Sequence, residues 1–225
     1  MRNALEIGGG FIVTTDNSGG IGEKVDDIFH VSDRVTAYFS ARVALLDQWA
    51  AYAEPIAVLI YNFSGSVSWE NYVQGVNDLF LEAGLGVPKI SGSTETNMDL
   101  KQSAVAVTMI GQKQEVVVAD DLQWFSYGTP LVGPEVIERA DEVASIKLIH
   151  EAIARGIVQR IWPVGSRGIA AEVRVLLDIS LDEVDSVLDV NKSAGPSTVV
   201  LLAIPVEKME VAINFFGKHL NELGI

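Results

Sequence analysis

The chain has 225 residues, of which 48% are hydrophobic and 20% charged, and these proportions are typical of a folded globular protein. Thirty acidic against sixteen basic residues give a formal net charge of −14, which disfavours nucleic acid as a partner because like charges repel. The absence of cysteine excludes disulfides and thiolate metal sites. No apolar run reaches the roughly 18 residues of a membrane-spanning helix, and residues 1–13 lack the pattern of a signal peptide. We therefore expect a cytoplasmic protein without a membrane partner.

The first half of the chain alternates between β-branched and helix-period segments. A β-branched run predicts a strand over 11–15 that stops at the glycine-rich segment 16–22. From Ser32, apolar residues recur every three or four positions and predict a helix that ends before Pro55. The elements expected next are a strand over 56–63, a helix from Ser68 to Gly84, a polar loop over 91–98, and strands over 104–110 and 115–119.

The second half of the chain is more loosely patterned. The elements expected there are one or two helices in 134–156, a helix over 169–178, a strand over 199–204 and a final helix over 206–223. The stretch 120–133 is the best candidate for a domain boundary. We therefore predict two domains, 1–120 and 121–225, and an α+β or α/β organisation.

The first polar segment that could carry chemistry is 14–16, at the end of a predicted strand, followed by glycines, Lys24 and Asp27. Carboxylates at a strand end beside a permissive backbone suit a hard cation and a phosphate chain. A solvated Gly/Asn turn explains the same residues equally simply.

Asp47 is the second candidate, because helical spacing places it on a face that otherwise looks buried. A buried carboxylate is costly unless it is paired or bound to a metal. Metal binding and a structural bond to Arg42 or a backbone donor are both open at this point. The third candidate is the loop 92–97, whose hydroxyls, carboxylate and amide either bind a ligand or cap a helix.

The order and spacing of these segments resemble the aminoimidazole ribonucleotide (AIR) synthase-related superfamily, which includes thiamine monophosphate kinase and selenophosphate synthetase. The family's T-T-D or D-G-V-G-T-K segment matches 14–16 followed by 20–24. Its S-D-x-x-A-x-G-A-x-P helix matches Asp47, eight residues before Pro55. Its G-G-E-T-A-E-M or G-G-D-T loop matches 92–98. The resemblance covers about residues 8–112.

The resemblance implies an α+β, AIR synthase-like fold, with a β-rich N-terminal domain that forms a homodimer and a shortened, ferredoxin-like C-terminal α/β domain. It implies ATP at a domain or subunit junction, with Mg²⁺ bridging the phosphates to carboxylates. The residues it implicates are Asp16 and Asp47 as catalytic residues and metal ligands, Asp27 and Glu95 as further metal ligands, Lys24, Thr94 and Asn97 as nucleotide contacts, and Gly8, Gly9 and Gly10 as a mobile strip over the phosphates.

Three features depart from the family pattern. The early G-D-D of the kinases is absent, and only glycines stand near its place. Thr94 occupies the position of the acid in the third motif, with Glu95 one place later, so the ligating residue of this loop is open. The chain also lacks the S-x-G-x-x-S-N-G-Y segment of the synthase, which argues against the ring-closing reaction.

Within the superfamily, the residues 16–24, 41–45 and 92–98 resemble the α-ribazole kinase branch most. That branch phosphorylates the ribose of a nucleoside in the salvage of the cobalamin lower ligand. We therefore expect an ATP- and Mg²⁺-dependent kinase that acts on a small nucleoside-like substrate. The alternatives are a thiamine monophosphate kinase-like or AIR synthase-like enzyme, and a non-catalytic regulatory protein that binds nucleotide.

Overall fold

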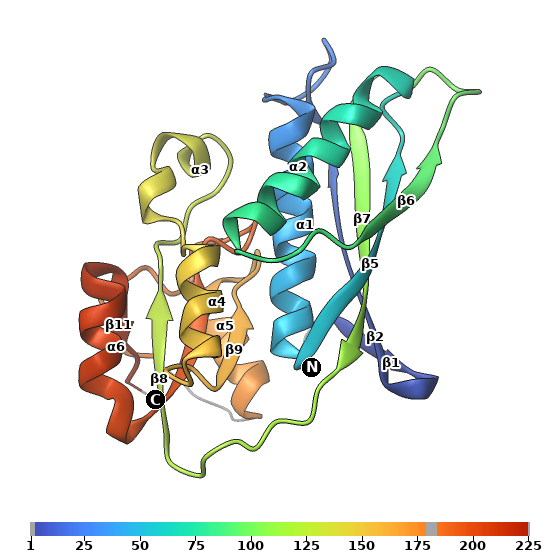
Figure 1. The fold of residues 1–225 in the computed structure, drawn as a ribbon. Helices are drawn as coiled ribbons and strands as arrows, with labels where there is room; N and C mark the ends of the chain where they lie inside the picture. The colour runs from blue at the N-terminus through green and yellow to red at the C-terminus, as the bar shows by residue number, and fades with distance from the viewer. Residues whose placement is uncertain (1–2, 179–183, 225) are drawn as a thin grey trace. The chain divides into compact units, whose positions relative to one another are not determined.

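A computed structural model describes residues 3–178 and 184–224 of the chain (Figure 1). The internal contacts divide the chain into two compact units, Met1–Glu115 and Val116–Ile225. The sequence places the boundary between its two expected domains at residue 120, and the independence of these domains stays a prediction. None of the described helices is both long enough and apolar enough to cross a membrane.

The first unit is built on a five-stranded sheet with the order β1-β2-β7-β5-β6. Helix α1 lies against β2, β5 and β7, and α2 packs on α1, so both helices cover the same face of the sheet (Figure 1). Within this sheet, all pairings are antiparallel except β5 with β6, and the separate pair β3 and β4 is parallel. The elements are β1 (Ala4–Ile7), β2 (Phe11–Gly19), β3 (Ile21–Gly22), β4 (Phe29–His30), α1 (Asp33–Ala50), β5 (Ala53–Asn62), α2 (Trp69–Glu82), β6 (Lys89–Thr94) and β7 (Ala104–Lys113), with 3-10 turns at Gly8–Gly10 and Ser66–Ser68.

Helix α1 confirms the helix expected from Ser32 onward. The hydroxyl of Ser32 accepts a hydrogen bond from the amide of Val35, which is the geometry of an N-cap. Small, fully buried side chains at Ala37, Ala41 and Ala44 line the helix. They allow the helix backbone to approach the sheet closely and so place α1 directly above β2.

Two segments expected to be loops are strands instead. Strand β2 continues through 16–19 because these residues pair with 104–107 of β7, which lie far away in the sequence. Residues 91–94 belong to β6, which runs parallel to β5. A Cβ at Gly92 would lie 1.9 Å from the carbonyl oxygen of Ile60, so the glycine permits the two strands to pair. The strand expected over 115–119 is wrong, since those residues are irregular.

The second unit contains a four-stranded antiparallel sheet with the order β11-β8-β10-β9. Strand β10 is central and buried along its whole length. The elements are β8 (Leu122–Tyr127), α3 (Glu135–Glu138), α4 (Ile146–Ala154), β9 (Arg160–Pro163), α5 (Gly168–Leu177), β10 (Val200–Pro205), α6 (Met209–Phe216) and β11 (Leu220–Glu222), with 3-10 turns at Ala140–Glu142, Val206–Lys208 and Gly217–His219.

The helix expected over 169–178 is confirmed as α5, whereas the final helix expected over 206–223 is wrong in extent. Helix α6 ends at Phe216 because Gly217 adopts a positive φ of 65°. The chain then turns back and adds β11 to the sheet beside β8. Leu220 therefore belongs to a strand and not to a helix.

Candidate functional site

Asp16 lies on β2, on the side of the strand that faces α1. Side chains alternate along a strand, so Asp16 shares a face with Thr14, two residues earlier. The Thr14 hydroxyl donates a hydrogen bond of 2.8 Å to the carbonyl of Ala44 in α1. Asp16 is half-buried. Its carboxylate therefore lies beside the helix, in an environment where charge interactions are stronger than in water.

Asp47 lies in the last turns of α1, and only 1% of its surface is exposed. The neighbouring side chain of Gln48 donates hydrogen bonds to Ile12 and Thr14 of β2. The helix therefore runs antiparallel to the strand, with Gln48 beside Ile12 and Ala44 beside Thr14.

The two carboxylates lie on opposite sides of the contact between Thr14 and Ala44. Asp16 is two residues beyond Thr14 along the strand, and Asp47 is three residues beyond Ala44 along the helix. Because the strand and the helix run in opposite directions, the two offsets add up to about 11 Å along the common axis. This value is the separation of the two backbone positions along the axis, and the carboxylates extend from these positions.

The alternative that Asp47 pairs with Arg42 is not favoured by the helix geometry. A separation of five residues places the two side chains about 140° apart around the helix axis. Arg42 lies beside Tyr38, one turn earlier. Burial raises the pKa of the Tyr38 hydroxyl, and the Arg42 guanidinium opposes that shift.

Gly8, Gly9 and Gly10 form the tight turn between β1 and β2, as Figure 1 shows at the start of the chain. Gly9 and Gly10 have φ values of 80° and 73°, in the left-handed region that glycine adopts without strain. The Gln112 side-chain amide donates to the carbonyls of Gly9 and Gly10 and ties the turn to β7. The turn precedes Ile12, so it lies at the Asp47 end of α1. Its mobility stays a prediction.

Lys24 and Asp27 lie near the other end of α1. Asp27 is buried and accepts hydrogen bonds from the amide and hydroxyl of Ser103 and from the amide of Lys24. A carboxylate has about four lone-pair positions, so these bonds leave little capacity for a metal ion. The Lys24 ammonium donates to the carbonyl of Leu100 and faces Asp99 at 3.8 Å. In this arrangement both side chains hold loops together.

Thr94, Glu95 and Asn97 lie where β6 ends. The Thr94 hydroxyl accepts a hydrogen bond from the Asn62 side chain. Half-buried Glu95 accepts hydrogen bonds from the amides of Asn97 and Met98, which lower the pKa of its carboxyl. This is the geometry of a self-capped turn.

The residues singled out in the sequence thus fall into two groups within the first unit. Asp16, Asp47 and the glycine turn 8–10 surround the middle and end of α1. Lys24, Asp27 and the loop 94–97 gather near its beginning, where β2 and β5 end. Helix α1 has 18 residues and is about 27 Å long, more than one nucleotide spans. Among the described residues, no group of three or more His, Asp and Glu is placed to hold a metal ion.

Sequence reasoning missed a cluster of polar residues at the start of α1. Asp33 is 3% exposed, its amide donates to Glu23, and one of its carboxylate oxygens has no hydrogen-bond partner. Burial raises the pKa of Asp33, and the negative charges of Glu23 and Asp27 add to that effect, whereas a hydrogen bond from Ser68 opposes it. An acid in the first turn of a helix is normally explained by the helix dipole, so the sequence carries no separate signal of burial.

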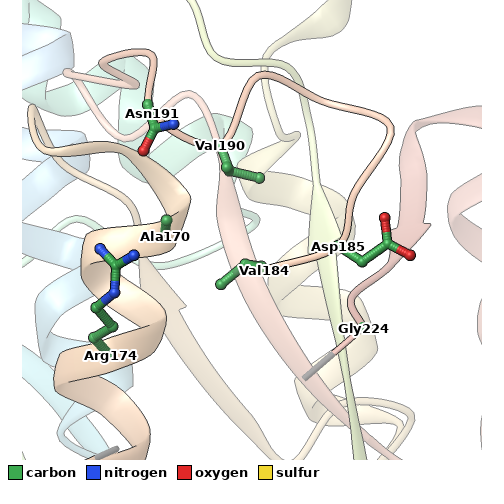
Figure 2. Close-up of a pocket in the computed structure, with 7 residues that line it drawn as sticks. All are labelled: Ala170, Arg174, Val184, Asp185, Val190, Asn191 and Gly224. Carbon is green, nitrogen blue, oxygen red and sulfur yellow. The ribbon is translucent and has the colours of Figure 1, made fainter. Parts of the chain in front are cut away.

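A surface cavity of about 500 Å³ lies in the second unit. Figure 2 shows Arg174 and Asn191 on one side of it, while the carboxylate of Asp185 points away from them. Val184 and Val190 supply apolar walls. None of the predicted site residues lines this cavity.

Comparison with known proteins gives structural neighbours but no sequence relatives. No protein-family model and no curated protein matches the chain. The thiamine monophosphate kinase of Aquifex aeolicus matches over 99% of this chain and 86% of that chain, with 13% identity and a TM-score of 0.63. The hydrogenase maturation protein HypE in complex with ATP matches over 98% and 77%, with 11% identity and a TM-score of 0.60. PurL of T. maritima complexed with AMPPCP matches over 99% and 42%, with 12% identity and a TM-score of 0.57.

These neighbours share the AIR synthase-like fold, so the fold expected from the sequence motifs is confirmed. At 11–13% identity the likeness establishes the fold and not the reaction. The reaction must therefore be argued from the site itself.

Proposed function

We propose that the chain is an ATP- and Mg²⁺-dependent phosphotransferase whose phosphate-binding site is built around Asp16 and Asp47. The observation that carries the proposal is the placement of these carboxylates on adjacent elements, on either side of the contact between Thr14 and Ala44. Support comes from the structural neighbours that contain ATP or AMPPCP. Because the net charge of −14 repels phosphate, a triphosphate would need cations between it and the protein.

The donor set fits Mg²⁺, which prefers carboxylate oxygens and keeps water and substrate phosphates as its other ligands. The carboxylates of Asp16 and Asp47 would each hold an ion. Bound Mg²⁺ would neutralise phosphate charge and so favour transfer of the terminal phosphoryl group. The backbone positions of the two residues are about 11 Å apart along the axis, estimated from helix and strand rise, and phosphates would bind between their side chains. The glycine turn 8–10 would close over them from the Asp47 end.

For the phosphoryl acceptor we propose the ribose hydroxyl of a small nucleoside, with α-ribazole as the leading candidate. The support is the resemblance of 16–24 and 92–98 to that kinase branch. A thiamine monophosphate kinase-like acceptor is the second candidate, supported by the neighbour from Aquifex aeolicus.

We further propose that the chain works as a homodimer through the sheet face opposite α1 and α2. Two aromatic side chains lie on that face, Tyr61 in β5 and Phe63 just beyond the end of the strand. They are 39% and 42% exposed. Leu59 and Ile110 are half-exposed on the same face. An apolar sheet face of this kind is typical of an interaction surface.

The decisive experiment measures ATP binding by calorimetry with and without Mg²⁺, and then ADP release with a panel of ribosides and thiamine monophosphate. We expect Mg²⁺-dependent binding and ADP release that depends on one acceptor. Binding without ADP release would favour the regulatory alternative. Undetectable binding with and without Mg²⁺ would refute the proposed function.

A further inference from the structure

Gln48 is a fully buried amide that joins α1 to the sheet beside Asp47. Its side-chain nitrogen lies 3.1 Å from the carbonyl oxygen of Ile12, 3.1 Å from the hydroxyl of Thr14 and 3.0 Å from the carbonyl oxygen of Met109. Because an amide has two hydrogens for these three acceptors, at least one hydrogen is shared. The side chain thus bonds to β2 and β7 at once.

Thr14 completes the connection from the side of the strand. Its hydroxyl donates to the carbonyl of Ala44 at 2.8 Å and accepts from Gln48, one turn further along α1. Only 1% of Thr14 is exposed. A single hydroxyl therefore binds two successive turns of the helix, and its bonds fix how far α1 can slide along β2.

The sheet makes room for this amide. A Cβ at Gly111 would lie 2.0 Å from the carbonyl oxygen of the Gln48 side chain, so the glycine leaves the space that the amide occupies. Strand β5 carries a bulge between Pro55 and Ala57, opposite Gly111. The Gln48 carbonyl oxygen has no hydrogen-bond partner among the described residues.

We propose that Thr14 and Gln48 form a clamp that sets the separation between the carboxylates of Asp16 and Asp47. The clamp rests on the proposed function, since it gives the two residues the role of positioning the site for magnesium and phosphate. Asp16 is two residues from Thr14, and Asp47 is next to Gln48, so sliding of α1 along β2 changes the distance between the carboxylates directly. Displacements of about 1 Å are enough to impair sites that depend on alignment.

The test compares Mg²⁺–ATP affinity and melting temperature in matched variants. Gln48→Met keeps length without hydrogen bonds, and Thr14→Val keeps shape without the hydroxyl. We expect each to weaken Mg²⁺–ATP binding about tenfold, equivalent to about 1.4 kcal/mol. The double variant should be little weaker than either single variant, because both break one connection. Thr14→Ser, which retains the hydroxyl, should bind like the wild type.

Ser64→Ala is the matched control, because it removes buried hydrogen bonds to Tyr72 and Ala104 in the same unit, away from the clamp. It should lower the melting temperature without weakening Mg²⁺–ATP binding. Wild-type affinity in Gln48→Met and Thr14→Val would overturn the clamp while leaving the proposed function intact. The clamp would also be overturned if the loss of affinity were proportional to the loss of melting temperature in every variant, Ser64→Ala included. Absence of Mg²⁺–ATP binding by the wild type would instead refute the function on which the clamp depends. Should Gln48→Met fail to fold, the comparison of Thr14→Val with Thr14→Ser decides.

Discussion

Ser103 donates two hydrogen bonds of 2.7 Å to the carboxylate of Asp27, one from its backbone amide and one from its hydroxyl. The two residues are 76 positions apart in the sequence, and their contact ties the turn before α1 to the beginning of β7. Burial raises the pKa of Asp27, but the hydrogen bonds from Ser103 and Lys24 outweigh it, so the net shift is downward. The folded state therefore favours the ionised carboxylate.

The first prediction concerns Asp27→Asn. The asparagine side chain offers the donors of Ser103 and Lys24 one acceptor oxygen, whereas the carboxylate offers two. We therefore expect a loss of about 1–3 kcal/mol in unfolding free energy at neutral pH. Because the folded-state pKa of Asp27 is lowered, its contribution is present above the unfolded value of 3.8 and is lost as pH falls through the folded value. Denaturant unfolding from pH 7 to pH 3 measures the difference between wild type and variant. A difference that does not shrink in acid would contradict the argument.

The second prediction has the opposite sign and concerns Asp33→Asn. Burial and the charges of Glu23 and Asp27 raise the folded-state pKa of Asp33. Because its pKa is raised on folding, Asp33 stabilises the folded wild type at pH values below its unfolded pKa of 3.8. This contribution is lost as the pH rises through the folded-state pKa. We therefore expect the stability of Asp33→Asn relative to the wild type to increase between about pH 4 and pH 7, as linkage requires.

The same unfolding series tests both carboxylates, because the two stability differences must change in opposite directions. Parallel pH profiles for the wild type and Asp33→Asn would show that the buried carboxylate is not perturbed. A Ser68→Ala variant provides a control, since the Ser68 hydrogen bond opposes the rise in the Asp33 pKa. Its loss should raise that pKa further and move the transition to higher pH.

The sequence predicts local features of this fold better than it predicts contacts between distant segments. The helical period from Ser32 and the capping serine are enough to locate α1. The continuation of β2 beyond Asp16 was not predictable, because its residues are polar and glycine-rich and gain strand structure only by pairing with β7. Sheet pairing in this region joins residues about ninety positions apart.

The candidate site shows the same division. Asp16 and Asp47 were singled out from motif order, and the helix period placed Asp47 correctly on a buried face. The bond between Gln48 and Thr14 has no local signal, since it joins residues 34 positions apart. The separation of Lys24 from Asp47 could not be predicted either, because it depends on the direction in which α1 crosses the sheet.

The third prediction tests the homodimer. Light scattering at micromolar concentration should give about twice the chain mass of 24.3 kDa. Tyr61→Glu places a charge on the apolar sheet face and should shift the protein to monomers, because burying an unpaired charge in an interface is costly. Val67→Glu, at an exposed position in a 3-10 turn, should leave the dimer intact. A wild-type monomer that still turns over ATP would exclude a site shared between subunits.

The last prediction places the phosphate chemistry at Asp16 and Asp47. Asparagine is nearly isosteric with aspartate, so Asp16→Asn and Asp47→Asn should fold while losing the charge that holds the metal ions. We expect each to lower the rate by ~10²–10³, the range for a lost electrostatic contact, and excess Mg²⁺ to restore part of it. Asp26→Asn changes an exposed carboxylate in the turn before α1 and should keep wild-type activity. Melting temperatures on the same samples distinguish a structural role, in which Asp47→Asn destabilises the fold while activity per folded molecule stays normal. Full activity in both variants would move the metal site elsewhere, with Glu95 as the next carboxylate to substitute, because Ser103 and Lys24 already occupy the carboxylate of Asp27.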